Sequence, residues 1–239
     1  MKGVAKLRYH HGALEQALVD EAVRQVRERG TDQVSLRGLA QIIGVSPSAA
    51  YQHFPDKAAL LMAVCQQGFE ELSGRMTSAV DAVTTEGDAG AVGRFLAVGT
   101  TYVEFAVAEP HLFRHMFGAA SAKGSQFTHP EDYADARWKE GGADPYDILL
   151  ARLAELSGRR LLRPGLEGQG LDVFAWSLVH GFSTLVVEEL LPLETGEPVL
   201  MLFGRLVLTD DAFGAFSRAA AEQAAPARAA EGAGAAGGR

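Results

Sequence analysis

Residues 30–57 contain several signals for the end or the start of a helix within a short distance. This feature of the sequence constrains the fold more than any other. Gly44 can take the left-handed backbone conformation in which helices commonly end. Ser46 is a good helix cap, and Pro47 fits the first helical position, where its missing N–H costs nothing. Pro55 then disfavours helical geometry in the residue before it. We therefore predict two short helices joined by a turn of about three residues.

Longer helices are predicted on either side of this stretch. Apolar residues recur at spacings of three and four from Leu14 to Val26, which indicates an amphipathic helix that ends at Gly30. Ser35 can cap the first short helix, and Asp56 can cap a long helix that follows the second one. Further helical periodicity is present at residues 89–117, 145–157, 169–191 and 198–221. No segment sustains the alternation of a strand, so the predicted fold class is all-α.

The chain divides into parts by charge and composition. Residues 1–57 hold eight basic and six acidic residues, whereas the rest of the sequence holds 14 basic and 24 acidic residues. A mildly basic head on an acidic body is expected where only the head meets a polyanion. We assign residues 1–57 to this head and residues 58–222 to a helical body with a mobile connection at 119–144. Residues 223–239 are expected to form a disordered tail.

The cysteine count and the apolar segments exclude several classes of protein. Cys65 is the only cysteine, so neither an intrachain disulfide framework nor a cysteine-rich zinc site can form. No apolar run follows the basic amino terminus. The longest apolar stretch, residues 173–187, is interrupted by polar residues and falls short of the roughly 20 residues that span a bilayer. We therefore expect a cytoplasmic protein with no membrane partner.

Small and polar side chains dominate the second short helix, residues 47–53. Ala49 and Ala50 are small enough to let a backbone approach the edges of DNA bases, and Ser48 and Gln52 offer hydrogen-bond donors and acceptors. Two short helices around a tight turn form a helix-turn-helix, whose second helix can lie in the major groove. The sequence therefore predicts a DNA-reading helix.

Phosphate contacts are predicted around the same helix. Tyr51 and His53 each combine a flat apolar body with a polar tip that can reach a phosphate. Lys57 lies in the first turn of the next helix, where a cation opposes the helix macrodipole. A phosphate at this helix terminus would offset that repulsion and accept hydrogen bonds from the free N–H groups.

The segment "TDQVSLRGLAQIIGVSPSAAYQHFPDKAALLMAV" resembles the DNA-binding region of the TetR family of bacterial transcriptional regulators, over residues 11–65. The resemblance implies a three-helix DNA-binding head on a larger helical body that binds ligand and dimerises. It implies phosphate contacts from Ser35, Arg37, Tyr51, His53 and Lys57, and base contacts from Pro47, Ser48, Ala49 and Gln52. Ser48 stands where the family commonly has glycine or another small residue, and Ala50 where it often has leucine, which could change the preferred base steps.

The basic amino-terminal arm, "KGVAKLRYHH", offers Lys6, Arg8 and Tyr9 for further DNA contacts. A disordered start with no such contacts is the alternative.

In the body, "FAWSLVHGFSTLVV" carries Trp176, His180 and Gly181, which resemble the "WHG" signature of one TetR subgroup. Trp176 and His180 share a helix face and are either part of an effector cavity or a buried pair satisfied internally. The candidate effector-binding residues are Phe105, His115, Phe117, Trp138, Trp176 and His180. His111 and His115 have the spacing of a metal-binding pair, but no third ligand stands nearby, so packing is the commoner explanation and we expect neither metal nor cofactor.

In the TetR family the last two long helices form the dimer interface, which here corresponds to residues 169–191 and 198–221. These helices carry more large apolar groups than a solvent-facing pair needs: Phe174, Leu178, Phe182, Leu185, Leu202, Phe203, Leu206, Val207 and Phe213.

The function expected from these features is a ligand-responsive homodimeric repressor that binds a palindromic operator and is released by a small-molecule effector. One alternative is an enzyme that uses a body cavity with His180 as base, although no nucleophile elbow, phosphate loop or carboxylate pair is present. The other is a small-molecule-binding helical protein whose DNA-binding head has degenerated.

Overall fold

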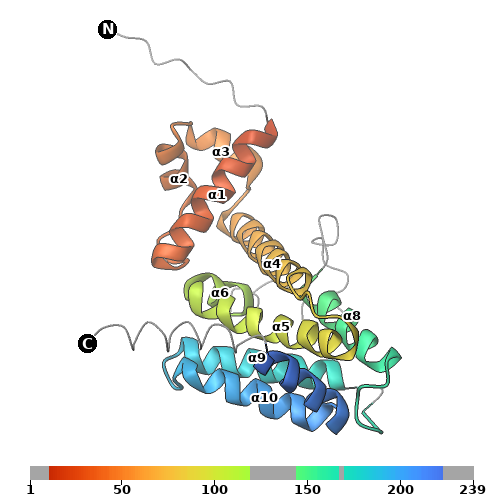
Figure 1. Ribbon diagram of the computed structural model, residues 1–239. Coiled ribbons are helices and arrows are strands. Elements are labelled where there is room, and N and C mark those ends of the chain that lie inside the picture. The colour runs from red at the N-terminus through yellow and green to blue at the C-terminus, as the bar shows by residue number, and fades with distance from the viewer. Residues whose placement is uncertain (1–10, 119–143, 167–169, 223–239) are drawn as a thin grey trace, which may run out of the picture. The chain divides into compact units, whose positions relative to one another are not determined.

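The computed structural model describes residues 11–118, 144–166 and 170–222 (Figure 1). Within these ranges the chain is helical and forms no strand, apart from one isolated antiparallel bridge between Leu162 and Leu208. The predicted all-α fold class is confirmed. The amino-terminal arm, Trp138 and the tail lie outside the described residues.

The helices fall into two compact units. Among the described residues, the head unit comprises 11–71 and 108–118, and the body unit comprises 72–107, 144–166 and 170–222. The head unit contains α1 (His11–Arg29), α2 (Leu36–Ile43), α3 (Pro47–His53), the first part of α4 (Lys57–Asp81) and α6 (Pro110–Phe117). The body unit contains the rest of α4, α5 (Gly87–Ala108), α8 (Pro145–Gly158), α9 (Leu171–Val187), the short 3-10 helix η3 (Leu193–Thr195), α10 (Gly196–Val207) and a last helical segment at 210–222. These units are defined by which residues pack together. The boundary at residue 57 between a DNA-binding head and a ligand-binding body is a functional one and remains a prediction.

The short helices begin and end where their capping residues predict. Ser35 Oγ accepts a hydrogen bond from Gly38 N at 3.1 Å, and Ser46 Oγ accepts one from Ala49 N at 3.2 Å. Gly44 ends α2 in the left-handed region with φ +81°. These contacts satisfy N–H groups that the first turn of a helix leaves without an intrahelical partner.

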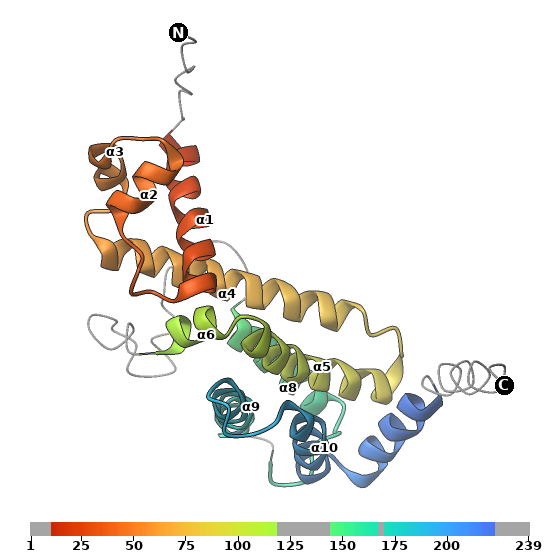
Figure 2. The same cartoon turned by 90° about the vertical axis from the view of Figure 1, so that its left-hand side faces the viewer.

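Three helices pack into the core of the head. α2 and α3 lie together on one side of α1 and contact both it and each other (Figure 2). Leu18 of α1, Leu39 of α2 and Ala50 of α3 are fully buried, and Phe54 closes the core just after α3. A seven-residue helix is too short to be stable alone, so these contacts hold α3 in place.

One predicted helix, residues 89–117, is two helices, and that prediction was wrong. α5 ends at Ala108 and α6 begins at Pro110, with Glu109 between them at φ −127° and ψ 53°. Proline has no N–H to donate and disfavours helical geometry in the residue before it. The chain therefore breaks at the boundary between the two units.

The predicted helix at 198–221 is also divided. α10 ends at Val207, and a new helical segment starts at residue 210. Thr209 caps it, because its Oγ1 accepts a hydrogen bond from Ala212 N at 3.3 Å. Thr209 N in turn donates to Leu161 O at 2.8 Å, which ties the break to the segment just after α8. This partner lies 48 positions away along the chain, so helical periodicity alone could not reveal it.

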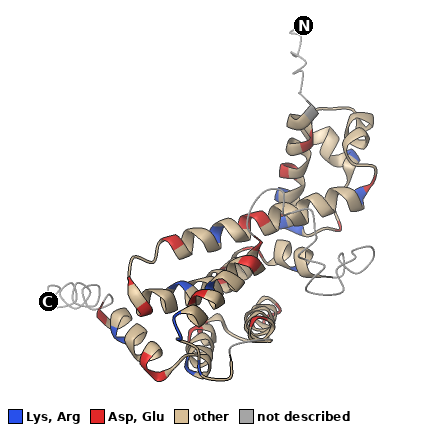
Figure 3. Ribbon diagram, turned by 90° about the vertical axis from the view of Figure 1, so that its right-hand side faces the viewer, with Lys and Arg blue, Asp and Glu red and all other residues tan. Residues whose placement is uncertain are grey.

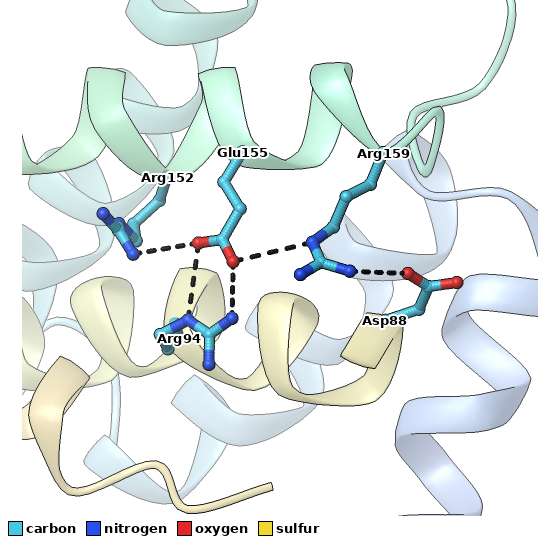
Figure 4. A network of polar contacts seen from close by, with 5 residues as sticks. All are labelled: Asp88, Arg94, Arg152, Glu155 and Arg159. Carbon is cyan, nitrogen blue, oxygen red and sulfur yellow. Dashed lines mark hydrogen bonds and ion pairs between the residues drawn. The ribbon is translucent and has the colours of Figure 1, made fainter. Parts of the chain in front are cut away.

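An ionic cluster joins α5 to α8 in the body unit (Figure 4). Glu155 of α8 accepts hydrogen bonds from Arg94 of α5 and pairs with Arg152 and Arg159 on its own helix. Arg159 also pairs with Asp88 at 3.2 Å. The hydrogen bond from Arg94, and then the charges around it, hold the pKa of Glu155 below its ordinary value. The cluster fixes the register between two helices that also form a cavity.

α5 is the one helix in the described ranges that is long and apolar enough to cross a bilayer by length and composition. Half of its most apolar window is buried inside the protein. Phe105 of α5 is fully buried, and the Arg75 guanidinium lies 5.2 Å from the centre of its ring. α5 thus supplies core side chains to the body unit.

Candidate functional site

The outer face of α3 is polar and open to solvent. Pro47, Ser48, Tyr51 and Gln52 are exposed, with Tyr51 47% exposed, and Ala49 is half-buried. α3 carries no Lys, Arg, Asp or Glu (Figure 3). An uncharged helix of this kind can meet the base edges in a DNA groove, while charged groups elsewhere contact the phosphates.

Ala50 faces the protein instead of the proposed DNA. Its exposed fraction is 0%, so the expectation that it lies beside base edges was wrong. α3 must bury one side against α1 and α2, and Ala50 lies on that side. The alanine at this position therefore belongs to the packed core of the head.

His53 and Lys57 both have protein partners. The side chain of His53 is only 10% exposed, and its Nδ1 lies 3.4 Å from Glu15 Oε2 on α1. Lys57 Nζ donates to Asp32 O at 3.2 Å. A backbone carbonyl oxygen thus provides the stabilisation that the sequence analysis ascribed to a phosphate. An ammonium group has three donors, so a phosphate contact from Lys57 stays a prediction.

Arginine charges in the head differ in how far they are neutralised. Arg24 pairs with Glu21 and Glu28, and Arg27 pairs with Glu71 and Glu109. Arg37, at the start of α2, is exposed and makes no ion pair within the described ranges. Its charge is therefore available to a phosphate beside the exposed cap residue Ser35.

A small cavity lies inside the body unit, between α5, α8, α9 and α10. It holds about 30 Å³ and is bordered mainly by apolar side chains. Three aromatic residues, Phe95, Tyr102 and Phe203, contribute to its walls together with aliphatic residues. A space of this size takes a few water molecules at about 10–15 Å³ each, so a larger ligand must displace the wall.

Tyr102 connects this cavity to a chain of aromatic residues. Its hydroxyl group lies 2.8 Å from His180 Nδ1, and the His180 ring centre lies 6.2 Å from that of Trp176. The Trp176 and Tyr146 rings are 5.9 Å apart, and the Tyr146 hydroxyl donates to Asp172. Burial lowers the pKa of His180, so its imidazole is neutral at neutral pH.

Comparison with known proteins identifies the family. Residues 18–64 match the family model described as bacterial regulatory proteins, tetR family, and residues 95–209 match the tetracyclin repressor-like C-terminal domain. The chain belongs to the TetR family. The two matches cover the DNA-binding head and most of the body, so the chain is a TetR-family transcriptional regulator.

Relatives and solved structures agree with this assignment. An uncharacterized HTH-type transcriptional regulator of Mycobacterium tuberculosis is 26% identical over 178 residues, which is 74% of this chain and 68% of the relative. A protein of unknown function from Rhodococcus sp. RHA1 is 28% identical with a TM-score of 0.67, covering 85% of this chain and 100% of that one. The transcriptional regulator FadR from Bacillus subtilis, solved with stearoyl-CoA, shares the fold at 17% identity and a TM-score of 0.57, covering 80% and 98% of the two chains.

The effector-binding residues predicted for this TetR-family chain do not form one cluster. Trp176 and His180 lie together in the body unit and Phe105 packs against Arg75, but none of these three is among the residues that border the cavity. His115 and Phe117 belong to the head unit. Trp138 is outside the described residues.

The head-unit histidines have different surroundings. His115 is buried, its Nε2 lies 2.8 Å from Leu61 O, and burial lowers its pKa. His111 is exposed. The described residues contain no group of three side chains suited to holding a metal ion.

Sequence reasoning missed Tyr102 and Tyr146, the two hydroxyl groups of the aromatic chain. Tyr102 follows Phe95 by seven positions, so both lie on one face of α5. That spacing was the signal that could have identified Tyr102, but it does not distinguish a residue that borders a cavity from one in a packed core. The partner helices decide which of the two it is.

Proposed function

We propose that this TetR-family regulator is a homodimeric repressor that reads a palindromic DNA operator with α3 and leaves it when a small molecule binds the body. The observation that carries the proposal is the arrangement of α3, which buries Ala50 and exposes Tyr51 and Gln52. A packed inner side and a polar outer side suit a helix that enters a DNA groove.

Base contacts are assigned to Pro47, Ser48, Ala49 and Gln52, and phosphate contacts to Ser35, Arg37, Tyr51, His53 and Lys57. Exposure supports most of these assignments. His53 has the weakest support, because its side chain faces Glu15 on α1. Lys57 can reach a phosphate with the donors that Asp32 O leaves unused.

An exposed apolar surface supports dimerisation through α9 and α10. Phe174 and Leu185 of α9 are exposed, and Leu202 and Leu206 of α10 are 59% and 56% exposed. A Cβ added at Gly181 of α9 would meet no atom within 4 Å, so a partner helix can approach closely there. Burying this surface in a second copy removes it from water, which is the main favourable term in association.

Three other apolar residues of this region do not belong to that surface. Phe182, Phe203 and Val207 are buried within their own chain. The apolar groups of the last helices thus divide between the core of the body unit and the proposed interface. A two-fold dimer would place its recognition helices about 34–36 Å apart, or a multiple of that, to match a palindrome.

Release requires an effector that binds the two states of the dimer with different affinity. Couplings of about 1–3 kcal/mol are typical and would weaken operator binding by roughly 5- to 150-fold. The body cavity is the proposed effector site, because Tyr102, whose hydroxyl group contacts His180 Nδ1, brings a polar group to an otherwise apolar space.

An electrophoretic shift assay with the DNA upstream of the chain's own gene tests the proposal. We expect a specific complex that weakens with salt, and we expect Arg37→Ala to weaken it and to lower the salt slope by about one. Arg218→Ala is the matched control, since Arg218 is an exposed arginine of the last helical segment. Tyr51→Ala should also weaken the complex without lowering thermal stability. Absence of a specific complex would favour a degenerate head.

A further inference from the structure

We propose that the cavity of the body unit binds a small neutral compound with one aromatic ring and a single hydrogen-bonding group. This inference rests on the proposed function, in which that cavity is the effector site. It adds the charge and the chemical class of the effector.

The walls of the cavity favour a ring. Phe95 and Phe203 border it with ring centres 5.9 Å apart at an interplanar angle of 37°, and Tyr102 adds a third ring. Aromatic pairs favour such tilted or edge-on arrangements at about 4.5–7 Å. Aliphatic residues, among them Leu149, Val179 and Leu200, form the rest of the apolar lining. A planar ring between these groups would gain contacts on several sides.

Tyr102 carries the one polar side-chain group among the described residues that border the cavity. The Tyr102 hydroxyl is held by His180 Nδ1 at 2.8 Å, and a hydroxyl group can donate once and accept twice. A ligand with a single hydrogen-bonding group matches this one hydroxyl group in an otherwise apolar lining.

The residues that border the cavity disfavour a charged ligand. No Lys, Arg, Asp or Glu is among the described residues that border the cavity. Arg94 lies next to Phe95 on α5, but its guanidinium group donates a hydrogen bond to Glu155. Asp172 accepts a hydrogen bond from Tyr146. A carboxylate in the cavity would therefore be buried without a cation, which is strongly unfavourable.

The small volume sets a limit on size. About 30 Å³ of space lets a single ring enter only if flexible side chains such as Leu149 and Leu200 move outward. Each further ring would demand a larger displacement of close-packed side chains. A one-ring compound is therefore favoured over a larger one.

Three probes that share a ring test the proposal: benzyl alcohol, toluene and benzoate. Saturation-transfer NMR on the full chain without DNA ranks their occupancy at equal concentrations and neutral pH. We expect benzyl alcohol to bind about two- to tenfold more tightly than toluene, the worth of one hydrogen bond. We expect benzoate to bind at least about tenfold more weakly than benzyl alcohol because its charge would lose its hydration.

Two variants locate the binding. A Cβ at Gly99 would lie 3.3 Å from Leu200 and 3.4 Å from Val179, so Gly99→Val should fill the cavity and abolish binding of benzyl alcohol and toluene. Gly74→Val is the matched control, because a Cβ at Gly74 meets no atom within 4 Å. Tyr102→Phe keeps the ring and should remove only the preference for the alcohol over toluene. This second variant keeps the test decisive if Gly99→Val does not fold.

The proposal is overturned if benzoate binds as tightly as benzyl alcohol, if no probe binds, or if Tyr102→Phe leaves the probe ranking unchanged. Its failure is separable from that of the proposed function. Operator binding by a protein that prefers benzoate overturns the ligand class alone, whereas the expected ranking without operator binding overturns the repressor function alone.

Discussion

The head unit and the body unit differ in where they keep their polar groups. In the head, α3 buries a small apolar side chain and leaves polar groups such as Gln52 in solvent. In the body, the Tyr102 hydroxyl contacts His180 Nδ1, and Tyr102 is the one polar side chain among the described residues that border an apolar cavity. The first arrangement suits a polyanion recognised in water, where salt screens the interaction. The second suits a ligand recognised by desolvation, where an unmatched charge is excluded.

The largest expected effect concerns the core of the body. Phe105→Ala removes a fully buried ring and should lower the free energy of unfolding by about 3–5 kcal/mol. Chemical denaturation followed by circular dichroism measures this loss. If the units differ as described, specific operator binding by the fraction that remains folded should persist. Loss of binding in folded protein would show that this body residue supports the head directly.

A backbone change should affect the head alone. Gly44→Ala puts a Cβ at φ +81°, where it touches no other atom within 4 Å, so the cost is conformational, about 1–2 kcal/mol. Operator binding should fall, and binding of benzyl alcohol should not change. In contrast, Gly74→Ala lies in the helical part of α4 and should stabilise by about 0.5–1 kcal/mol. Equal effects of the two changes would contradict the assigned backbone geometry.

Acidification should test both units through one histidine in each, the buried His115 and the half-buried His180. Burial lowers the pKa of His115 in the head and of His180 in the body. Below about pH 6.5 the unfolded chain binds protons that the folded chain does not, so stability should fall as the pH drops from there toward the lowered pKa values.

Denaturation at a series of pH values measures that loss. His180→Phe should flatten part of it, because the imidazole with the lowered pKa is then absent. A further loss at lower pH is expected from Glu155 and Asp172, whose pKa values are lowered by hydrogen bonds from Arg94 and Tyr146 respectively. A profile that His180→Phe does not alter would show that this imidazole makes no contribution.

The smallest expected effect is at the surface of the body. Asp88→Asn removes the exposed pair with Arg159 and should change the free energy of unfolding by less than about 1 kcal/mol. Glu155→Gln should cost more, since Glu155 accepts hydrogen bonds from Arg94 and is less exposed. Thermal unfolding of both variants provides the comparison. A larger loss from Asp88→Asn would mean that the exposed end of the cluster holds α8 on α5.

Local signals account for the success of prediction in the head. Ser35, Gly44, Ser46 and Pro47 act on backbone groups within a few positions of themselves, so their effects could be inferred without knowing what packs nearby. Pro110 also acts on the backbone next to it, and it separates α5 from α6. The prediction of one helix over residues 89–117 gave helical periodicity more weight than this proline and so missed the separation. That error was avoidable from sequence alone.

Packing decided what local signals could not. Whether Ala50 meets DNA or the core depends on which face α1 and α2 cover, and whether Tyr102 borders a cavity depends on α8, α9 and α10. The break at Thr209 likewise depends on a hydrogen bond to Leu161 O. By itself, the sequence determined the all-α class, the helix-turn-helix and the family resemblance, because caps, breakers and periodicity act at short range. Only the tertiary structure decided which side chains are buried, paired or open, because those properties arise from residues distant along the chain.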